Sequence, residues 1–485
     1  MPNSGTGHRR PRLRAMASTS SGGFQSPRRE VLDELVEKVL GVWSDLDMAR
    51  DIEPELDDTS KMLLQLGLPE DGAGALDSVK CALRLLDQST AQSRPRFFAY
   101  IGSSGLEIGA IADFLAATYD INLAVDSRAA SQLEQQTASW LGDFIGFSGA
   151  KGLFTSGGTV SNITALAIAR TKADPSSRRA GVTQKMSVYC STEAHYSNQR
   201  AVELLGLGSE SLRAMPTDHL RKMDCKALRA AIQEDLKAGV TPMAIIASAG
   251  TTLTGAIDPL LEIAAIAKEF GIWLHVDGAY GAPAAGTEQA RAKFAGLDLA
   301  DSVTIDAHKW LFVPKACSIL LTKDWAPVFN TFNHDEAYMP HDEDSLNPTD
   351  LTLEYSRPVR ALKLWMGFYA HGAAQFRQAI AGNLRLAQYA YQIAKQDPDF
   401  RVLPHEPELS IIPMQFVPSA GLDISEHNKK LCEELVKDGR IFISPAVIDG
   451  EVWLRPCFTN FRTTESDVDE LFKAIREVSE KISRR

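Results

Sequence analysis

Lys309 has the most informative chemical surroundings of any residue in this sequence. It lies in segment 306–310 (DAHKW), just past the apolar run 302–305, which is typical of a β-strand. Most lysines are solvated surface cations, but the apolar residues 310–312 that follow predict a desolvated side chain. Desolvation and nearby positive charge would lower its pKa and produce the free amine that attacks an aldehyde. Lys309 is therefore a candidate nucleophile.

Asp277 is a carboxylate at the end of a second apolar run, 273–276. In an open α/β sheet, the carboxyl ends of the strands converge on the ligand crevice. A carboxylate there could pair with a protonated pyridine nitrogen, which keeps the ring cationic and makes it a better electron sink. The alternative is that Asp277 caps the turn that follows it.

Segment 156–159 (SGGT) follows an apolar run and opens a helical stretch that reaches Arg170. Backbone N–H groups at the start of a helix are free to bind a phosphate, and the hydroxyl of Thr159 could join them. Glycines at such a position could also be simple turn residues.

His195 and Ser248 complete the set of polar residues after predicted strands. His195 follows the run 186–190 and could stack on a flat cofactor ring, whereas Ser248 ends the run 243–248 and faces the same crevice. Each residue alone is more typical of a structural role. Together with Lys309, Asp277 and the glycine turn, they supply an amine, a pyridine partner, a ring stacker and a phosphate cradle on successive strand ends.

The elements that position these residues alternate between strands and helices. Short apolar runs are separated by helix-length stretches such as 259–270. This βαβα pattern predicts a mostly parallel sheet covered by helices. The runs are 152–154, 186–190, 243–248, 273–276, 302–305 and 318–321.

The chain after residue 372 has a different pattern. An amphipathic stretch, 373–396, precedes shorter predicted strands and a final helix, 465–482, which indicates a smaller α+β domain at 373–485. The predicted strands of this domain are 409–416, 441–444 and 452–456.

The N-terminal part contains no recognisable chemistry. Residues 1–29 combine arginine with serine and glycine and have no acid before Glu30, which predicts a disordered basic tail, with an organelle transit peptide as the alternative. Helical spacing in 31–42 predicts a helical arm at 30–90, followed by a large domain at 91–372.

Composition favours small-molecule chemistry. The formal net charge of the 485 residues is −11, which argues against a nucleic-acid surface. No apolar run reaches the roughly 18 residues of a membrane-spanning helix. The six cysteines show neither metal-binding spacing nor a disulfide framework, so we expect a cytoplasmic protein.

From about Ser93 to the C-terminus, these motifs together resemble the group II pyridoxal-phosphate decarboxylases, which include aromatic-amino-acid, histidine and glutamate decarboxylases. The resemblance implies the fold type I architecture of aspartate aminotransferase and pyridoxal 5'-phosphate as cofactor. It also implies a homodimer with active sites shared at the interface, no bound metal, and neither nucleic acid nor membrane as a partner.

The resemblance carries over residue by residue. Lys309 is similar to the family's Schiff-base lysine, Asp277 to the pyridine partner and His195 to the stacking histidine, and these three are the expected catalytic residues. Asp306 stands where animal members have an asparagine near the phosphate, and His308 could neutralise its charge. The other expected cofactor contacts are Gly158, Thr159, Ser248 and Ala279.

The substrate pocket is also assigned by resemblance. Segment 95–100 is similar to the family's substrate-entry segment, which makes Tyr100 and Ser103 candidate pocket residues. Asp120 and Asn122 stand where the aromatic enzymes place apolar side chains that reach the partner's pocket. Gly372 would leave room beside a bulky substrate.

The activity implied is decarboxylation of an L-amino acid, with an aromatic or other bulky side chain favoured. The family's mobile loop carries a tyrosine that assists protonation at Cα, but Pro348 stands at that position, and the nearest tyrosines are Tyr338 and Tyr355. His195 or water could donate the proton instead. The acidic loop 333–344 indicates a mobile lid rather than a metal site.

Three alternatives remain open. Reaction with oxygen could give an aldehyde, and cleavage without CO2 release would make the protein a carbon–carbon lyase. A protein that binds the cofactor but has lost catalysis could serve as a scaffold.

Overall fold

The computed structural model describes residues 28–49, 55–334, 347–418 and 423–484. The chain divides into two compact units, one of residues 1–44 and 55–89 and one of 45–54 and 90–485. The predicted tail therefore lies almost entirely outside the described residues. The first unit contains most of α1 (Arg28–Leu46), together with α2 (Asp58–Leu64) and α3 (Ala75–Asp87).

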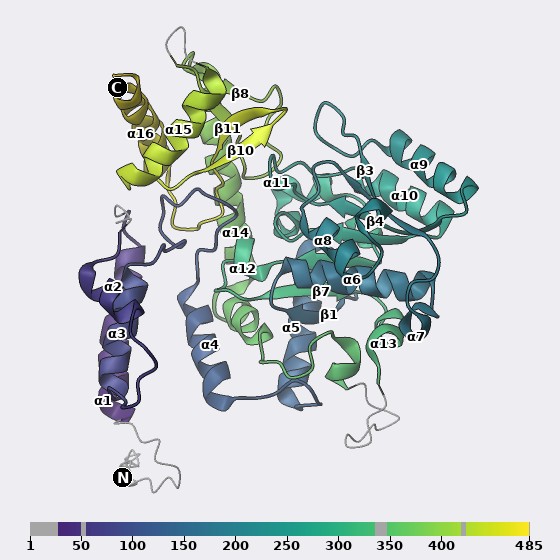
Figure 1. Cartoon of the computed structure of the whole chain (residues 1–485), viewed down its shortest axis with the longest axis horizontal. Coiled ribbons are helices and arrows are strands. Elements are labelled where there is room, and N and C mark those ends of the chain that lie inside the picture. The colour runs from purple at the N-terminus through teal and green to yellow at the C-terminus, as the bar shows by residue number, and fades with distance from the viewer. Residues whose placement is uncertain (1–27, 50–54, 335–346, 419–422, 485) are drawn as a thin grey trace, which may run out of the picture. The chain divides into compact units, whose positions relative to one another are not determined.

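The second unit is built on a seven-stranded sheet, four of whose strands, β1, β3, β4 and β7, are labelled in Figure 1. The strand order is β1-β7-β6-β5-β4-β2-β3. β7 runs antiparallel to β1 and β6, and all other neighbouring pairs are parallel. The strands are β1 (Lys151–Thr155), β2 (Met186–Ser191), β3 (Leu212–Met215), β4 (Thr241–Ser248), β5 (Trp273–Asp277), β6 (Ser302–Ile305) and β7 (Ser318–Thr322).

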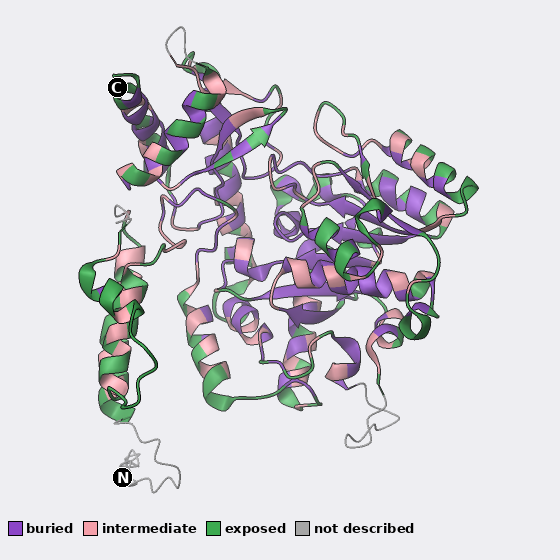
Figure 2. Ribbon diagram, in the orientation of Figure 1, coloured by how far each residue is buried: buried purple, intermediate pink, exposed green. Residues whose placement is uncertain are grey.

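Helices bury both faces of this sheet (Figure 2). On β4, Ile245 and Ala247 belong to one apolar core, whereas Ala244 and Ile246 belong to the other. A strand covered on both faces has no polar side to expose, which explains the continuous apolar runs in the sequence. The first core includes α5 (Ala129–Ile145), α9 (Cys225–Lys237) and α10 (Leu260–Phe270), and the second includes α6 (Gly158–Ala173), α8 (Ser197–Leu204) and α13 (Ala326–Phe332).

A smaller antiparallel sheet lies in the C-terminal part, in the order β10-β11-β9-β8. It packs with three helices around a third core. Its strands are β8 (Phe400–Val402), β9 (Met414–Phe416), β10 (Ser444–Ile448) and β11 (Glu451–Arg455), and the helices are α14 (Ala361–Gln396), α15 (Ile424–Asp438) and α16 (Glu465–Ser483). The fold is therefore the predicted α/β architecture with a smaller α+β domain.

The predicted boundary at residue 372 falls inside α14. Gly372 has φ 73° and ψ 152°, which interrupts the helical backbone at that point. Residues before the break pack in the first core and residues after about 386 pack in the third, so one kinked helix joins the two layers. The boundary itself stays a prediction.

Some local predictions in the C-terminal part are wrong. Segment 441–444 was expected to be a strand, but β10 begins only at Ser444, because Phe442 pairs instead with the distant segment 96–98 through its backbone N–H and C=O. Only the last three residues of 409–416 form a strand. The charged helix α15 and the short strands β3 and β8 were not predicted.

Within the described ranges, no helix is long and apolar enough to cross a membrane.

Candidate active site

A cavity of about 940 Å³ lies at the carboxyl ends of the central strands. The large sheet contributes the turn after β1, the ends of β4 and β5, and the segment after β6, while the C-terminal domain contributes Phe442, Ser444 and Arg455. The parallel strands place their polar ends at one edge of the sheet, as expected for this class of fold.

The structure brings all of the predicted cofactor residues to this one cavity. They come from five separate segments of the chain, and the predicted pocket residue Tyr100 lies with them. The residues are Gly158, Thr159, His195, Ser248, Asp277, Ala279, His308 and Lys309.

The glycine turn forms the start of α6. Gly157 is the N-cap residue and Gly158 the first helical residue, so N–H groups of the first turn face outward from the positive end of a 16-residue helix. A Cβ atom on Gly158 would lie 2.9 Å from Oδ2 of Asp306 and 3.2 Å from Cβ of Ala279. Only glycine fits this close approach, and the helix end it forms is suited to a phosphate.

Lys309 lies in the short helix α12 (Ala307–Trp310) after β6. Its Nζ atom lies 2.8 Å from Oδ2 of Asp306. Burial lowers the pKa of Lys309, but the carboxylates of Asp306 and Asp277 outweigh burial, so the pKa is raised. The predicted lowering is therefore wrong, because it left out the carboxylate of Asp306, which is only three residues earlier in the chain.

Asp306 is buried, and its Oδ1 atom has no hydrogen-bond partner within the part of the chain that the structure describes. Burial raises its pKa, but Lys309 and His308 reverse this effect and lower it overall. Nε2 of His308 lies 3.7 Å from Oδ2 of Asp306, but burial lowers the pKa of His308, so neutralisation of the carboxylate by His308 stays a prediction.

Asp277 accepts two hydrogen bonds. Oδ2 accepts from Nδ2 of Asn162 at 2.8 Å, and Oδ1 accepts from the backbone N–H of Ala279 at 3.2 Å. His195 is partly buried, and burial lowers its pKa despite the nearby carboxylate of Asp277. A neutral imidazole and a hydrogen-bonded carboxylate therefore face the same cavity.

These residues fit pyridoxal phosphate. The start of α6 would hold the phosphate, Asp277 the pyridine nitrogen, and Lys309 the aldehyde carbon. His195 and Ala279 line the same cavity and are the candidates for the two faces of the ring.

Arg455 is a cavity residue that the sequence analysis missed. It ends β11 and is buried; Nε donates to the carbonyl of Thr252 at 2.7 Å and Nη1 donates to the carbonyl of Tyr100 at 3.1 Å. Nη2 is buried without a hydrogen-bond partner among the described residues. An arginine directly after the apolar run 452–454, within the predicted strand 452–456, was the available signal, since an unneeded charge is rarely buried.

The other predicted pocket residues do not line this cavity. Ser103 is buried and donates to the carbonyl of Val313 at 3.1 Å. Asp120 is exposed at the end of α4 (Glu107–Tyr119), and Gly372 lies at the break in α14. Their roles toward substrate stay predictions.

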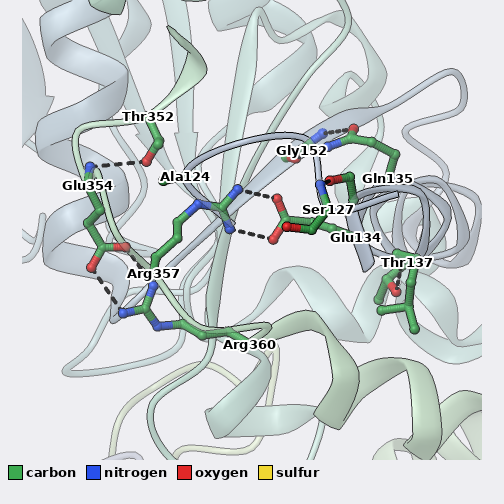
Figure 3. A network of polar contacts seen from close by, with 12 residues as sticks. Ala124, Ser127, Glu134, Gln135, Thr137, Gly152, Thr352, Glu354, Arg357 and Arg360 are labelled. Carbon is green, nitrogen blue, oxygen red and sulfur yellow. Dashed lines mark hydrogen bonds and ion pairs between the residues drawn. The ribbon is translucent and has the colours of Figure 1, made fainter. Parts of the chain in front are cut away.

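A polar network anchors the segment around Arg357 (Figure 3), and Asn122 contributes hydrogen bonds to the same segment. The guanidinium of Arg357 donates two bonds of 2.6 Å to the buried carboxylate of Glu134. Oδ1 of Asn122 accepts from the backbone N–H of Arg357 at 3.2 Å, and Nδ2 donates to Ser356 at 3.1 Å. In this chain, Asn122 therefore anchors the loop that contains Ser356 and Arg357.

The loop that was expected to act as an acidic lid, 333–344, lies mostly outside the described residues, and so does Tyr338. Pro348 begins a short 3₁₀ helix, η5 (Pro348–Leu351), and the next residue, Thr349, donates its N–H to the carbonyl of Ala124 at 3.1 Å.

Comparison with known proteins gives a consistent result. The family described as "Pyridoxal-dependent decarboxylase conserved domain" matches residues 64–416. An aromatic-L-amino-acid decarboxylase from Bacillus atrophaeus is 33% identical over 427 residues, which cover 86% of this chain and 88% of that protein. A phenylacetaldehyde synthase from Petunia hybrida is 31% identical, over 74% of this chain and 76% of that protein.

Solved structures share the fold. The Oryza sativa TDC with PLP and tryptamine superposes with a TM-score of 0.86 at 23% identity, covering 94% of this chain and 98% of that one. Tryptophan decarboxylase of Catharanthus roseus superposes with a TM-score of 0.84 at 22% identity, with the same coverage.

Proposed function

Since the chain belongs to the pyridoxal-dependent decarboxylase family and is an enzyme that uses pyridoxal phosphate, we propose that it removes the α-carboxylate of an L-amino acid and releases the matching amine with CO2. The observation that carries the proposal is the convergence of Lys309, Asp277, His195 and the start of α6 on one cavity. An aromatic or other bulky side chain is favoured, since the relative from Bacillus atrophaeus is an aromatic-L-amino-acid decarboxylase.

Bound pyridoxal phosphate supplies the electron sink for the pair of electrons that remains when the bond between Cα and the carboxylate breaks. When the cofactor is bound, the carboxylate of Asp277 would stabilise positive charge on the pyridine nitrogen, and Lys309 would provide the amine that holds the cofactor. Residues of the cavity thus hold fixed charges where charge develops during the reaction.

Arg455 is suited to bind an anionic group of the substrate. Its Nη2 atom lacks a partner among the described residues, and it lines the cavity. A guanidinium donates strong hydrogen bonds to a carboxylate. We propose that Arg455 holds a carboxylate of the amino acid.

His195 is the candidate donor of the proton that returns to Cα. The backbone N–H of Ser197 lies 3.2 Å from Nδ1 of His195, so Nδ1 accepts a hydrogen bond. The neutral ring then carries its hydrogen on Nε2. This assignment gives the site a proton donor although Pro348 replaces the loop tyrosine.

A second candidate activity is oxidative. The relative from Petunia hybrida is a phenylacetaldehyde synthase, and Pro348 removes the expected tyrosine from the proton-return step. In that reaction the amino acid, O2 and water would give the aldehyde, CO2, ammonia and hydrogen peroxide. The carbon–carbon lyase and the silent scaffold have no such observation in their favour.

We further propose that the protein is a cytoplasmic homodimer with active sites at the interface. α4 exposes the large apolar side chains Ile111, Phe114 and Tyr119, which are 41%, 52% and 74% exposed. A patch of this kind marks a protein interface. Sedimentation equilibrium should give twice the chain mass, and a monomer at micromolar concentration would contradict this proposal.

A panel of L-amino acids tests the activity. The purified protein, reconstituted with pyridoxal phosphate, should release CO2 and one amine in equal amounts. Aldehyde with ammonia and peroxide would support the oxidative candidate, and the absence of turnover on every amino acid would contradict both.

A further inference from the structure

A chain of buried hydrogen bonds leads from Trp273 to the cavity. Nε1 of Trp273 lies 2.9 Å from Oγ of Ser302, which lies 2.9 Å from Nδ1 of His275. Nε2 of His275 lies 3.1 Å from Oδ1 of Asn162, and Nδ2 of Asn162 lies 2.8 Å from Oδ2 of Asp277. All five side chains are buried.

The direction of this chain follows from the chemistry of its last member. A carboxylate can only accept, so Nδ2 of Asn162 donates to Asp277 and Oδ1 of Asn162 faces Nε2 of His275 as an acceptor. Burial lowers the pKa of His275 to about 4, so the ring is neutral near pH 7. A neutral ring that donates at Nε2, where Thr304 also lies 3.4 Å away, accepts at Nδ1, so the hydroxyl of Ser302 donates there.

Asn162 is fixed from both sides. Its Oδ1 atom accepts from His275, so Nδ2 faces Asp277; the reversed amide would place oxygen against a carboxylate and N–H against N–H. The second hydrogen of Nδ2 is available to Oγ of Ser197 at 3.1 Å, with a longer contact of 3.4 Å to Asn198. Ser197 in turn lies 2.9 Å from Nδ1 of His195.

The network thus ends on both functional groups. One branch donates to Asp277, and the other reaches Nδ1 of His195 through Ser197. The titratable groups that face Asp277 are His195, Lys309 and His275. Among these three groups, His275 is separated from Asp277 by a single hydrogen-bonded residue, Asn162. Both ring nitrogens of His275 take part in hydrogen bonds.

We infer that Asn162 is a positioning residue that joins the pyridine partner to the stacking histidine, and that the chain from Trp273 holds a hydrogen-bond donor on the carboxylate of Asp277 and keeps the proton of His195 on Nε2. This inference rests on the proposed use of Asp277 and His195. It assigns a functional task to Trp273, Ser302 and His275, none of which lies among the catalytic residues.

The test compares variants of buried residues by their affinity for the cofactor, a measurement that requires no turnover. The variants are Asn162→Ala, which removes the junction, His275→Leu, which removes both ring nitrogens, and His275→Gln, which can still donate from the position of Nε2. The matched control is His427→Leu, because His427 is also buried and its Nε2 lies 2.9 Å from Oγ of Ser479, in the C-terminal domain. For each variant, the dissociation constant of pyridoxal phosphate is measured from pH 5 to 9, together with the Tm of the cofactor-free protein.

Asn162→Ala and His275→Leu should weaken cofactor binding about tenfold at pH 7, since each removes support from a hydrogen bond to a charged group. The acid-side pH at which binding is half lost should rise by about one pH unit. His275→Gln should recover most of both effects, and His427→Leu should lower the Tm without moving that pH.

The inference would be overturned if Asn162→Ala and His275→Leu lower the Tm, as the control does, but leave unchanged the acid-side pH at which cofactor binding is half lost (the midpoint). If neither variant folds, Ser302→Ala decides the question, because it removes only the hydroxyl that orients His275: a raised midpoint supports the inference and an unchanged one contradicts it. Decarboxylation by the unsubstituted enzyme is measured separately, so the inference can fail while the proposed function stands.

Discussion

The ammonium of Lys309 lies 2.8 Å from the buried carboxylate of Asp306. This ion pair raises the pKa of the lysine, although burial alone would lower it. Only the neutral amine attacks an aldehyde. Attachment of the cofactor must therefore break the pair, and Asp306 controls the pH at which this happens.

Asp306→Asn should make Lys309 more reactive. Removing the carboxylate lowers the pKa of the lysine, so a larger fraction is neutral at any pH below that pKa, and the rate of cofactor attachment should rise about tenfold at pH 7, as for a pKa change of one unit. The change in visible absorbance after mixing with pyridoxal phosphate measures this rate. The exposed Asp143→Asn variant is the control and should react at the unsubstituted rate; an equal or slower rate in Asp306→Asn would refute the role of the ion pair.

Lys309→Ala should abolish covalent attachment of the cofactor. Borohydride reduction of the unsubstituted protein should fix the cofactor to the peptide that contains Lys309, as read by mass spectrometry, whereas the variant should carry no label there. Lys315 lines the same cavity, so Lys315→Ala is the matched control and should retain the label. Label on any other lysine of the unsubstituted protein would show that the nucleophile is misassigned.

Arg455→Gln should raise the KM for the amino acid about tenfold or more, because a hydrogen bond between charged groups is lost in a buried site. Arg455→Lys keeps the charge and should recover part of the loss. Steady-state kinetics on the preferred substrate measure both. If the KM of Arg455→Gln stays within twofold of the unsubstituted value while its Tm is unchanged, Arg455 does not bind substrate.

The pair of Arg357 and Glu134 should show strong coupling, since the two side chains are only 2% and 5% exposed. Arg357→Met leaves Glu134 as an unpaired buried charge and should cost about 3–5 kcal/mol of unfolding free energy. The double variant with Glu134→Leu should recover most of that loss. Urea unfolding of both single variants and the double variant completes the cycle, and additive losses would show that the pair contributes little.

The main site residues could be predicted because each follows an apolar run, and strand ends in a mostly parallel sheet meet at one edge. That rule located Lys309, Asp277, His195 and Ser248 without any knowledge of their contacts. The large sheet was predicted for the same reason, apart from β3.

Residues whose role depends on distant contacts could not be predicted in this way. Asn162 is 115 residues from Asp277, and Arg455 is 203 residues from the carbonyl of Thr252 that holds it. The pKa of Lys309 was predicted in the wrong direction for a different reason: the prediction weighed burial but left out the carboxylate of Asp306, which is only three residues earlier in the chain. Helix α15 was missed because its charged face hides its apolar positions.

The reaction in D2O tests the central claim most directly. With the preferred amino acid, CO2 and amine should appear in equal amounts, and mass spectrometry should find one non-exchangeable deuterium in the amine, at the carbon that lost the carboxylate. Aldehyde with hydrogen peroxide, or a product that retains the carboxylate, would contradict decarboxylation with return of a proton.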